Sequence, residues 1–371
     1  MDKKKVLIVF GTRPEAIKMI PVVKAFQEDA TMDVVVCNTA QHRQMTDQVM
    51  QYFSIQAQHD LDIMKDRQTL NGLFSRLMAG LDTVMTVEKP DIVLVHGDTS
   101  TCLAACLAAF HLQIPVGHVE AGLRTYDFTQ PFPEEMNRQL CDQIASLHFA
   151  PTQRAVDQLK KQLGDQKSIV HVGNTIVDAV QLALPMIDED NKAIVRLKSW
   201  LDLEKKCIVV TGHRRENFGT AILDIIRALK ELAHAQNVQI IYPVHLNPQV
   251  QEPVNAHLGD LDNVLLCDPL DYESFLWLLH KSDFIITDSG GIQEEATVLQ
   301  KRVLVTRNTT ERQEAVDSGH ITLVGSDFDT IISESKKLLH NNVDIDNLSQ
   351  PYGFGNSSQK IVQSCKFFLG E

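Results

Sequence analysis

The sequence predicts an α/β protein built from two doubly wound domains of parallel strands. Short β-branched runs alternate with helical stretches, this alternation occurs twice in the same order, and the unusual polar residues follow the strands. The predicted strands are residues 4–10, 33–38, 90–97 and 114–119 in the first half, and residues 205–212, 238–244, 283–290 and 301–307 in the second. Apolar strands separated by helices are typical of parallel sheets with helices on both faces.

The composition sets limits on the function. The chain has 371 residues, 44% of them hydrophobic, which is enough for two domains with cores of their own. The formal net charge of −13 opposes sequence-independent binding to nucleic acid or to an anionic membrane, so a phosphate ligand needs a local cationic pocket. The apolar run before Gly11 is too short for a signal peptide, and no run of about 18 apolar residues occurs. We therefore expect a cytoplasmic protein without nucleic-acid or membrane partners.

The seven cysteines are an odd number and include no CxxC pair. Cys102 and Cys106 lie four residues apart in an apolar stretch that is typical of a buried helix. We expect reduced thiols in the core.

The carboxyl ends of parallel strands bind ligands, so two such domains facing one another form a cleft lined by the loops after the strands. Those loops are residues 11–15, 96–98 and 118–122 in the first half, and residues 211–216, His245, 288–291 and 310–312 in the second. We expect an N-terminal domain over residues 1–175, a C-terminal domain over residues 176–355, and a last amphipathic helix over residues 356–371.

The turn Ser289-Gly290-Gly291 lies between a strand and a helix, where backbone N–H groups and a helix N-terminus suit a diphosphate. The alternative is that Ser289 is an ordinary helix N-cap. Arg13, His213 and Arg312 follow three other strands and favour the diphosphate. Glu294 and Glu295 suit the helix dipole, or one of them accepts the hydroxyls of a ribose. Since no GxGxxG follows a strand and no GxxxxGK[ST] occurs, an NAD site and a P-loop are disfavoured.

Three carboxylates form the second candidate site. Asp98, Glu120 and Glu134 all lie in loops of the first half, where charged residues at strand ends are candidate acids and bases. The alternative is that they cap helices or pair with Arg124 and Arg138.

The sequence around these carboxylates partly matches the ligand pattern of binuclear phosphoesterases. Its opening DxH is missing and its GN is out of order, so we expect no metal. We expect His96 and His118 to be hydrogen-bonded strand-end residues rather than ligands.

The chain resembles the bacterial non-hydrolysing UDP-N-acetylglucosamine 2-epimerases. The motifs that carry the resemblance run from Gly11 to about Gly355 and are GTRPEAIKMIP, TAQHRQM, VLVHGDTST, IPVGHVEAGLRT, PFPEEMNRQ, TGHRRENFG, YPVHLNP, TDSGGIQEEA and TTERQEA. The resemblance implies a GT-B architecture, in which two Rossmann-like domains face a central cleft and the C-terminal helix crosses back to the N-terminal domain. It also implies a homodimer that converts UDP-N-acetylglucosamine to UDP-N-acetylmannosamine, and the turn GTRPEAIKM favours the non-hydrolysing class.

The resemblance also implies the roles of individual residues. Asp98, Glu120 and Glu134 match the catalytic carboxylates of the family, and His213 matches a histidine near the diphosphate. The positions implied for UDP are Arg13, Lys18, Phe275, Ser289, Gly290, Gly291, Glu295 and Arg312. The positions implied for a second, allosteric substrate molecule are Gln41, Gln44, Arg67 and His245.

The chemistry of the sugar explains this set of groups. The C2 proton has no adjacent carbonyl, so the available route without a nicotinamide is elimination of UDP to 2-acetamidoglucal followed by re-addition. This route needs stabilisation of the leaving diphosphate and general acid/base groups at C2, but no cofactor.

Three rival functions remain open at this point. A hydrolysing epimerase would release UDP and free sugar, a GT-B glycosyltransferase would need an acceptor pocket, and a nucleotide-sugar sensor would need no carboxylates. The chain departs from the family pattern at Thr297-Val298, Arg302, Gln313 and Phe354, which puts the loop geometry near Arg312 in question.

Overall fold

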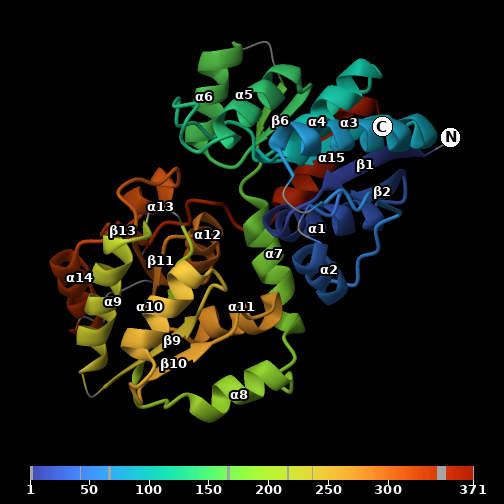
Figure 1. Cartoon of the computed structure of the whole chain (residues 1–371). Helices are drawn as coiled ribbons and strands as arrows, with labels where there is room; N and C mark the ends of the chain where they lie inside the picture. The colour runs from blue at the N-terminus through green and yellow to red at the C-terminus, as the bar shows by residue number, and fades with distance from the viewer. Residues whose placement is uncertain are drawn as a thin grey trace. The chain divides into compact units, whose positions relative to one another are not determined.

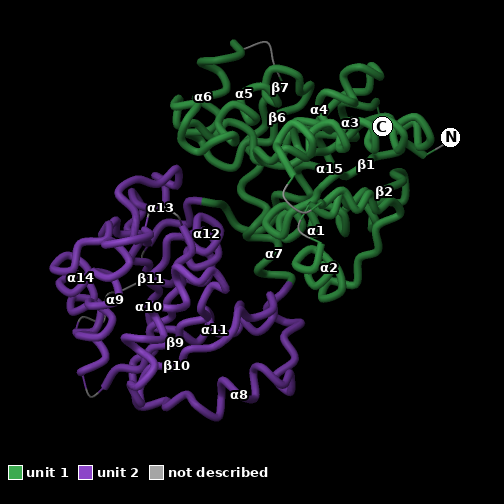
Figure 2. The backbone as a smooth tube through the Cα atoms, viewed as in Figure 1, with its two compact units in different colours: residues 1–182, 352–371 green, residues 183–351 purple. Residues whose placement is uncertain are grey.

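The structure is a computed structural model that describes residues 3–41, 43–65, 68–164, 168–214, 217–235, 237–340 and 348–370. It contains two compact units (Figure 2). Unit 1 comprises residues 1–182 and 352–371, and unit 2 comprises residues 183–351. Strands and helices alternate along each of them (Figure 1).

Unit 1 is a seven-stranded sheet with its helices. Its strands are β1 (Lys4–Phe10), β2 (Met32–Asn38), β3 (His59–Asp60), β4 (Ile92–His96), β5 (Val116–Val119), β6 (Leu147–Ala150) and β7 (Ser168–His171). Its helices are α1 (Arg13–Glu28), α2 (Arg43–Tyr52), α3 (Leu70–Glu88), α4 (Ser100–His111), α5 (Glu134–Ile144), α6 (Gln153–Leu163), α7 (Thr175–Ala183) and α15 (Ser357–Leu369).

Unit 2 is a six-stranded sheet with its helices. Its strands are β8 (Lys206–Thr211), β9 (Val238–Pro243), β10 (Val264–Cys267), β11 (Phe284–Thr287), β12 (Arg302–Val305) and β13 (Ile321–Leu323). Its helices are η1 (Leu184–Met186), α8 (Lys192–Trp200), α9 (Thr220–Ala233), α10 (Pro248–Leu258), α11 (Tyr272–Lys281), α12 (Gly290–Val298), α13 (Gln313–Asp317) and α14 (Phe328–His340).

The two sheets have equivalent strand orders. The order is β3-β2-β1-β4-β5-β6-β7 in unit 1 and β10-β9-β8-β11-β12-β13 in unit 2. All pairings in both sheets are parallel. The order reverses between β1 and β4 and again between β8 and β11, and a reversal of this kind marks the ligand-binding edge of a doubly wound sheet. The predicted α/β class with two doubly wound halves is confirmed.

The eight predicted strands are all present, and the sequence analysis missed β3, β6, β7, β10 and β13. Each of these five has at most four residues, and β3, β7, β10 and β13 carry half-buried or exposed residues, so they lack the long apolar run that identifies an interior strand.

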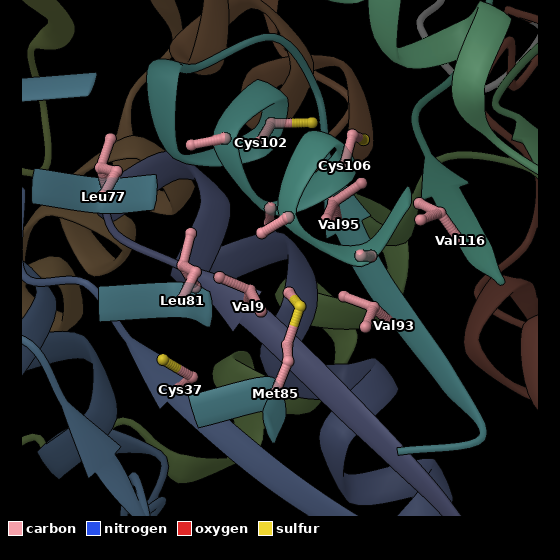
Figure 3. Packing of buried hydrophobic residues seen from close by; sticks show 14 of the residues in the cluster. Val9, Cys37, Leu77, Leu81, Met85, Val93, Val95, Cys102, Cys106 and Val116 are labelled. Carbon is pink, nitrogen blue, oxygen red and sulfur yellow. The ribbon is translucent and has the colours of Figure 1, made fainter. Parts of the chain in front are cut away.

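The core of unit 1 packs α3 and α4 against the sheet. Leu73, Leu77 and Leu81 recur every four residues and form the buried face of α3. Figure 3 shows Leu77 and Leu81 among the same buried residues as Val9, Val93 and Val95 of the neighbouring strands.

The cysteines are reduced, as expected, and six of the seven are buried. Cys102 and Cys106 lie on the buried helix α4. Cys267 in β10 is half-buried.

Helix α15 completes unit 1 although it follows unit 2 in the sequence. It packs on α1 (Figure 1), and Lys366 pairs with Asp29 at 2.8 Å. The backbone N–H groups of Ser357 and Ser358 donate to the carboxylate of Asp178 in α7, at 3.3 and 2.9 Å. In the described part of the chain, no helix combines the length and the apolar character needed to cross a membrane.

Candidate functional site

In unit 1, a buried carboxylate joins the two loops at the strand-order reversal. Glu15 in the first turn of α1 accepts hydrogen bonds from the backbone N–H groups of Gly11 and Thr12, at 3.1 and 2.8 Å. Its other oxygen accepts one from the hydroxyl of Thr99, which caps α4, at 2.7 Å. Burial raises the pKa of Glu15, and the hydrogen bond from Thr99 opposes this rise. Glu15 therefore fixes the loop after β1 to the loop after β4.

Glu120 follows β5 and forms a buried ion pair with Lys18 of α1. The two side chains are only 9% and 5% exposed. The backbone of Glu120 lies in the left-handed region, with φ of 64°, which is unusual for a residue with a side chain. Lys18 was expected at UDP, and in the structure its ammonium contacts the candidate catalytic carboxylate.

His96 at the end of β4 lies beside the same carboxylate. Its Nε2 is 3.6 Å from Glu120 Oε2, and within the described ranges this buried atom has no hydrogen-bond partner. The expectation that His96 is a fully hydrogen-bonded strand-end histidine is therefore wrong. The sequence could not show that His96 lies beside Glu120, because the position of the Glu120 carboxylate depends on the backbone turn at this residue.

Asp98 follows β4, and two residues of α5 hold it. Arg138 forms an ion pair with its carboxylate, and the Asn137 amide donates to its backbone carbonyl at 2.8 Å. The structural alternative of pairing with Arg138 is thus correct for Asp98, whose side chain is still 26% exposed. Glu134 is the first residue of α5, three and four residues before Asn137 and Arg138, so it lies on the same helix face.

Asp98 and Glu120 follow neighbouring strands. His96 pairs with Val119 in the sheet, and the N–H of Gly97 donates to the carbonyl of Val119 at 2.9 Å. The structure thus brings together Asp98, Glu120, Lys18 and His96 at one edge of the sheet, next to the helix that carries Glu134.

His118 has a structural environment, as expected. Its ring is fully buried and contacts Asp142 at 2.6 Å and the carbonyl of Gly97 at 2.7 Å. Burial lowers the pKa of His118, but the charge and hydrogen bond of Asp142, together with smaller contributions from Cys106 and the Gly97 carbonyl, outweigh burial and raise it overall. Within the described part of the chain, Arg124 pairs with Asp142 and with none of the three candidate carboxylates.

In unit 2, the turn Ser289-Gly290-Gly291 begins α12. Ser289 is at the N-cap position of α12, as the alternative supposed, but its side chain makes no capping hydrogen bond. A Cβ on Gly290 would lie 2.8 Å from the guanidinium carbon of Arg312, whereas a Cβ on Gly291 would meet nothing within 4 Å. The first-turn N–H groups of a helix have no partner within the helix, so this turn offers donors to an anion.

Arg312 is held over this turn by two glutamates. Its guanidinium lies 3.0 Å from Glu294 and also pairs with Glu311. Arg312 pairs with Glu294, and both candidate ribose acceptors, Glu294 and Glu295, are buried. Phe275 is buried in α11.

His213 and Asp288 form a pair that links the loops after β8 and β11. Asp288 is fully buried, and its Oδ1 lies 3.0 Å from His213 Nδ1. Its Oδ2 accepts hydrogen bonds from the backbone N–H groups of His213 and Arg214, each at 2.9 Å. The His213 side chain is 44% exposed. Burial raises the pKa of Asp288, but the hydrogen bond and charge of His213 together with the backbone N–H groups of Arg214 and His213 outweigh it, so the pKa is lowered overall.

The sequence analysis assigned no function to Asp288. The feature that could have indicated one is its position directly after β11 and before the Ser-Gly-Gly turn. Arg215 and Glu216 of the same motif lie outside the described residues.

The structure gives the positions of most candidate allosteric residues. Gln41 follows β2 and accepts a hydrogen bond from Thr101 at 3.2 Å, and Gln44 is exposed on α2. In unit 2, the ring of His245 stacks on His213 with 5.8 Å between centroids. Arg67 lies outside the described residues.

Comparison with known proteins identifies the family. The family model of the UDP-N-acetylglucosamine 2-epimerases matches residues 24–366. The chain belongs to the UDP-N-acetylglucosamine 2-epimerase family. A UDP-N-acetylglucosamine 2-epimerase from Salmonella typhimurium is 48% identical over 98% of this chain and 99% of its own. The chain is therefore an enzyme of the isomerase class.

Solved structures agree with this family in fold. A UDP-GlcNAc 2-epimerase from Neisseria meningitidis, bound to UDP-GlcNAc, has a TM-score of 0.90 and 44% identity over 97% of this chain and 99% of that one. A co-structure with UDP from S. aureus has a TM-score of 0.90 and 43% identity over 99% of this chain and 97% of that one. The predicted GT-B type of fold, with two Rossmann-like domains, is confirmed.

The departures from the family pattern do not replace any candidate site residue. Thr297 lies inside α12, where its hydroxyl donates to the carbonyl of Gln293 at 2.7 Å. Arg302 begins β12 and donates to the carbonyl of Gly319. Gln313 begins α13, and Phe354 is exposed.

The lowered pKa of Asp288 predicts a pH-dependent effect of Asp288→Asn. Folding stabilises the charged form of Asp288. Its contribution to the free energy of unfolding is therefore complete above the ordinary pKa of 3.8 and is lost as pH falls through the lower pKa of the folded protein. We expect the substitution to lower the free energy of unfolding of unit 2 by about 1.5–3 kcal/mol at pH 7, and by less as pH falls below about 4. Urea unfolding at several pH values measures this.

Asp224→Asn is the matched control, because Asp224 is a half-exposed aspartate of the same unit that pairs loosely with Arg227 at 3.6 Å. We expect a change within about 0.5 kcal/mol for this control. A destabilisation by Asp288→Asn that is the same at every pH would contradict the assignment of the lowered pKa to Asp288.

Proposed function

We propose that the enzyme interconverts UDP-N-acetylglucosamine and UDP-N-acetylmannosamine by inverting C2 without net hydrolysis. Family membership supports 2-epimerase activity on this nucleotide sugar. The observation that carries the mechanism is the buried Lys18–Glu120 pair with the His96 nitrogen 3.6 Å away, beside the loop of Asp98. Such a cluster of proton-transfer groups at one strand edge is more than nucleotide binding requires.

The proposed route is elimination followed by re-addition. A base removes the C2 proton as the C1–O bond to UDP breaks, which gives 2-acetamidoglucal and UDP. UDP then adds back at C1 while an acid returns a proton to the opposite face of C2. Nothing is consumed, so the route needs no cofactor.

Unit 1 supplies the acid/base groups in this proposal. Glu120 and Glu134 exchange protons with C2, and Asp98 positions the sugar or supports the exchange. The ammonium of Lys18 offsets the cost of burying the Glu120 charge. Arg138 and Asn137 fix Asp98, which supports a positioning role.

Unit 2 supplies most of the nucleotide site in this proposal. Ser289, Gly290 and Gly291 bind the diphosphate, the two glycines through their backbone N–H groups, and Arg312 contributes positive charge. The N–H of Ser289 donates to the Thr287 hydroxyl at 3.0 Å. Glu295 accepts the ribose hydroxyls, and Phe275 lies at the uracil. His213, oriented by Asp288 at 3.0 Å, presents Nε2 to the diphosphate. Arg13 of unit 1 completes the proposed set.

Incubation with UDP-N-acetylglucosamine in deuterated water tests the reaction. We expect deuterium at C2 of both recovered nucleotide sugars, with UDP and 2-acetamidoglucal present only in small amounts in quenched samples. Mass spectrometry and proton NMR measure the label. Accumulation of free UDP and N-acetylmannosamine would instead support a hydrolysing epimerase. Unlabelled substrate would exclude epimerisation and would favour a glycosyltransferase or a sensor.

Glu120→Gln tests the acid/base assignment. The amide cannot accept the C2 proton, so we expect kcat to fall at least about 100-fold while UDP affinity stays within about threefold. Glu28→Gln is the control, because Glu28 is an exposed glutamate at the end of α1. Unchanged turnover by the Glu120 variant would remove this residue from the mechanism.

We propose, from the resemblance, that a second UDP-N-acetylglucosamine molecule activates the enzyme through Gln41, Gln44, Arg67 and His245. The stacking of His245 on His213 supports a link between this set and the catalytic histidine. We expect sigmoidal rates and a lag when UDP-N-acetylmannosamine is the only substrate. Hyperbolic kinetics without a lag would contradict the proposal.

Two further proposals rest on the resemblance alone. The enzyme forms a homodimer, which light scattering tests. Its product supplies N-acetylmannosamine units to a bacterial surface polysaccharide, which analysis of the polysaccharide in a strain lacking the enzyme tests.

A further inference from the structure

Three thiols lie close together in the core of unit 1, near the loop that carries Asp98. Cys102 and Cys106 lie one turn apart on α4, and Cys141 lies on α5. The three sulfur atoms are within 4.8 Å of one another, and those of Cys102 and Cys141 are 3.5 Å apart. All three residues are at most 1% exposed. Figure 3 shows Cys102 and Cys106 beside Val95 in the buried core.

These distances fit three ligands of one metal ion. Sulfur binds zinc at about 2.3 Å, so three sulfurs around an ion of that size in a trigonal arrangement lie about 4 Å apart, and slightly farther apart around a larger soft ion. This separation falls between the observed 3.5 Å and the upper limit of 4.8 Å. Small rotations of the side chains are enough to reach it.

Buried charged groups lie next to the thiols. Asp142 follows Cys141 in α5, contacts His118 at 2.6 Å and pairs with Arg124. When both ring nitrogens of His118 donate, to Asp142 and to the carbonyl of Gly97, these three residues carry a net charge of about +1. Positive charge next to a cysteine is the setting that stabilises a thiolate.

Among the residues that the structure describes, no further cysteine, histidine or carboxylate joins this cluster. Both ring nitrogens of His118 are engaged, one by Asp142 and the other by the carbonyl of Gly97. The neighbouring residues of this core are apolar, with Val95, Val116 and Ala105 among them. Zinc prefers four ligands in structural sites, so a trithiolate without a fourth ligand suits a softer ion of the cadmium or mercury type.

We propose that Cys102, Cys106 and Cys141 bind one soft divalent cation as a three-coordinate trithiolate. Three S–H bonds break, three metal–sulfur bonds form, and three protons pass to solvent. No atom changes oxidation state. The bound group carries a charge of −1, which the net positive charge of the adjacent buried residues balances.

The site is coupled to Asp98 through two of its ligands. The Cys102 thiol donates to the carbonyl of Gly97, the residue before Asp98, at 3.4 Å. Cys141 lies three residues after Arg138, which pairs with Asp98. Metal binding removes the thiol proton that Gly97 accepts and fixes α5 to α4. We therefore expect the loaded enzyme to turn over more slowly, and this consequence rests on the proposed function.

Titration with Cd²⁺ tests the site directly. We expect one Cd²⁺ per chain by native mass spectrometry, a sulfur-to-cadmium charge-transfer band in the ultraviolet, and proton release on binding. Cys102→Ala, Cys106→Ala and Cys141→Ala should each weaken Cd²⁺ binding at least about tenfold and reduce the band. Cys207→Ala and Cys365→Ala remove buried thiols outside the cluster, so they should bind Cd²⁺ as the unchanged protein does. Circular dichroism establishes that each variant is folded.

Because the thiols are buried, Cd²⁺ is added both to the folded enzyme and during refolding from urea. The proposal is overturned if neither route gives one bound ion, if the three cluster variants bind as well as the controls, or if thiol titration of the unfolded protein shows a Cys102–Cys141 disulfide.

Turnover is a separate readout. Inhibition by one equivalent of Cd²⁺, reversed by a chelator and absent in Cys141→Ala, supports the coupling to Asp98. Cd²⁺ binding without inhibition would support the metal site and contradict its coupling to Asp98. A protein without epimerase activity would contradict only the proposed function.

Discussion

Both candidate sites depend on one constraint, the reversal of strand order in a parallel sheet. The connections after the two central strands run in opposite directions along the sheet, so the loops at the ends of these strands diverge. The polar groups of these loops therefore face an open edge of the sheet. In each unit a buried carboxylate joins these loops. Glu15 comes from the first side in unit 1 and accepts the Thr99 hydroxyl from the second. Asp288 comes from the second side in unit 2 and accepts the N–H groups of His213 and Arg214 from the first. The two similar units thus hold their two loops together with a buried carboxylate, which comes from the first loop in unit 1 and from the second loop in unit 2.

The charged residues at these edges form ion pairs that add little to stability. Lys18–Glu120, Arg138–Asp98 and Arg312–Glu294 are pairs in which at least one side chain is nearly buried. The desolvation of such pairs offsets most of their attraction, so apolar residues of similar volume would stabilise a fold as well or better. Under the proposed function, these pairs hold the charged groups in fixed positions before a ligand binds. The incomplete hydrogen bonding of His96 fits the same interpretation, because a structural histidine in that position would be fully bonded, as His118 is.

The sequence predicted the interior strands and the loops that carry the site, because both depend on local patterns. Long runs such as residues 4–10 and 205–212 can be read without knowing their neighbours. It could not distinguish His96 from His118, since both lie at or next to the end of a strand and the difference is a contact between His118 and Asp142, which is 24 residues away. The missing capping hydrogen bond of Ser289 has the same origin, and so does the pairing of Asp98 with Arg138 rather than with Arg124. They depend on which loops meet at an edge, and one sequence without relatives does not specify this.

The net charge of −13 limits how a diphosphate can be bound. The cations closest to the proposed sites already have acidic partners, with Arg312 between Glu294 and Glu311 and Lys18 on Glu120. A phosphate that approaches Arg312 therefore competes with two carboxylates, and the gain from that contact is reduced by what the ion pairs lose. The N–H groups of Gly290 and Gly291 at the start of α12 carry no such cost, because first-turn N–H groups have no partner within the helix. In the proposed site, backbone amides then supply most of the net affinity for the diphosphate, and the guanidinium of Arg312 lies against Gly290, where a side chain would collide. For this reason the position of Gly290 depends on the absence of a Cβ, whereas Gly291 faces open space and is free to approach the ligand.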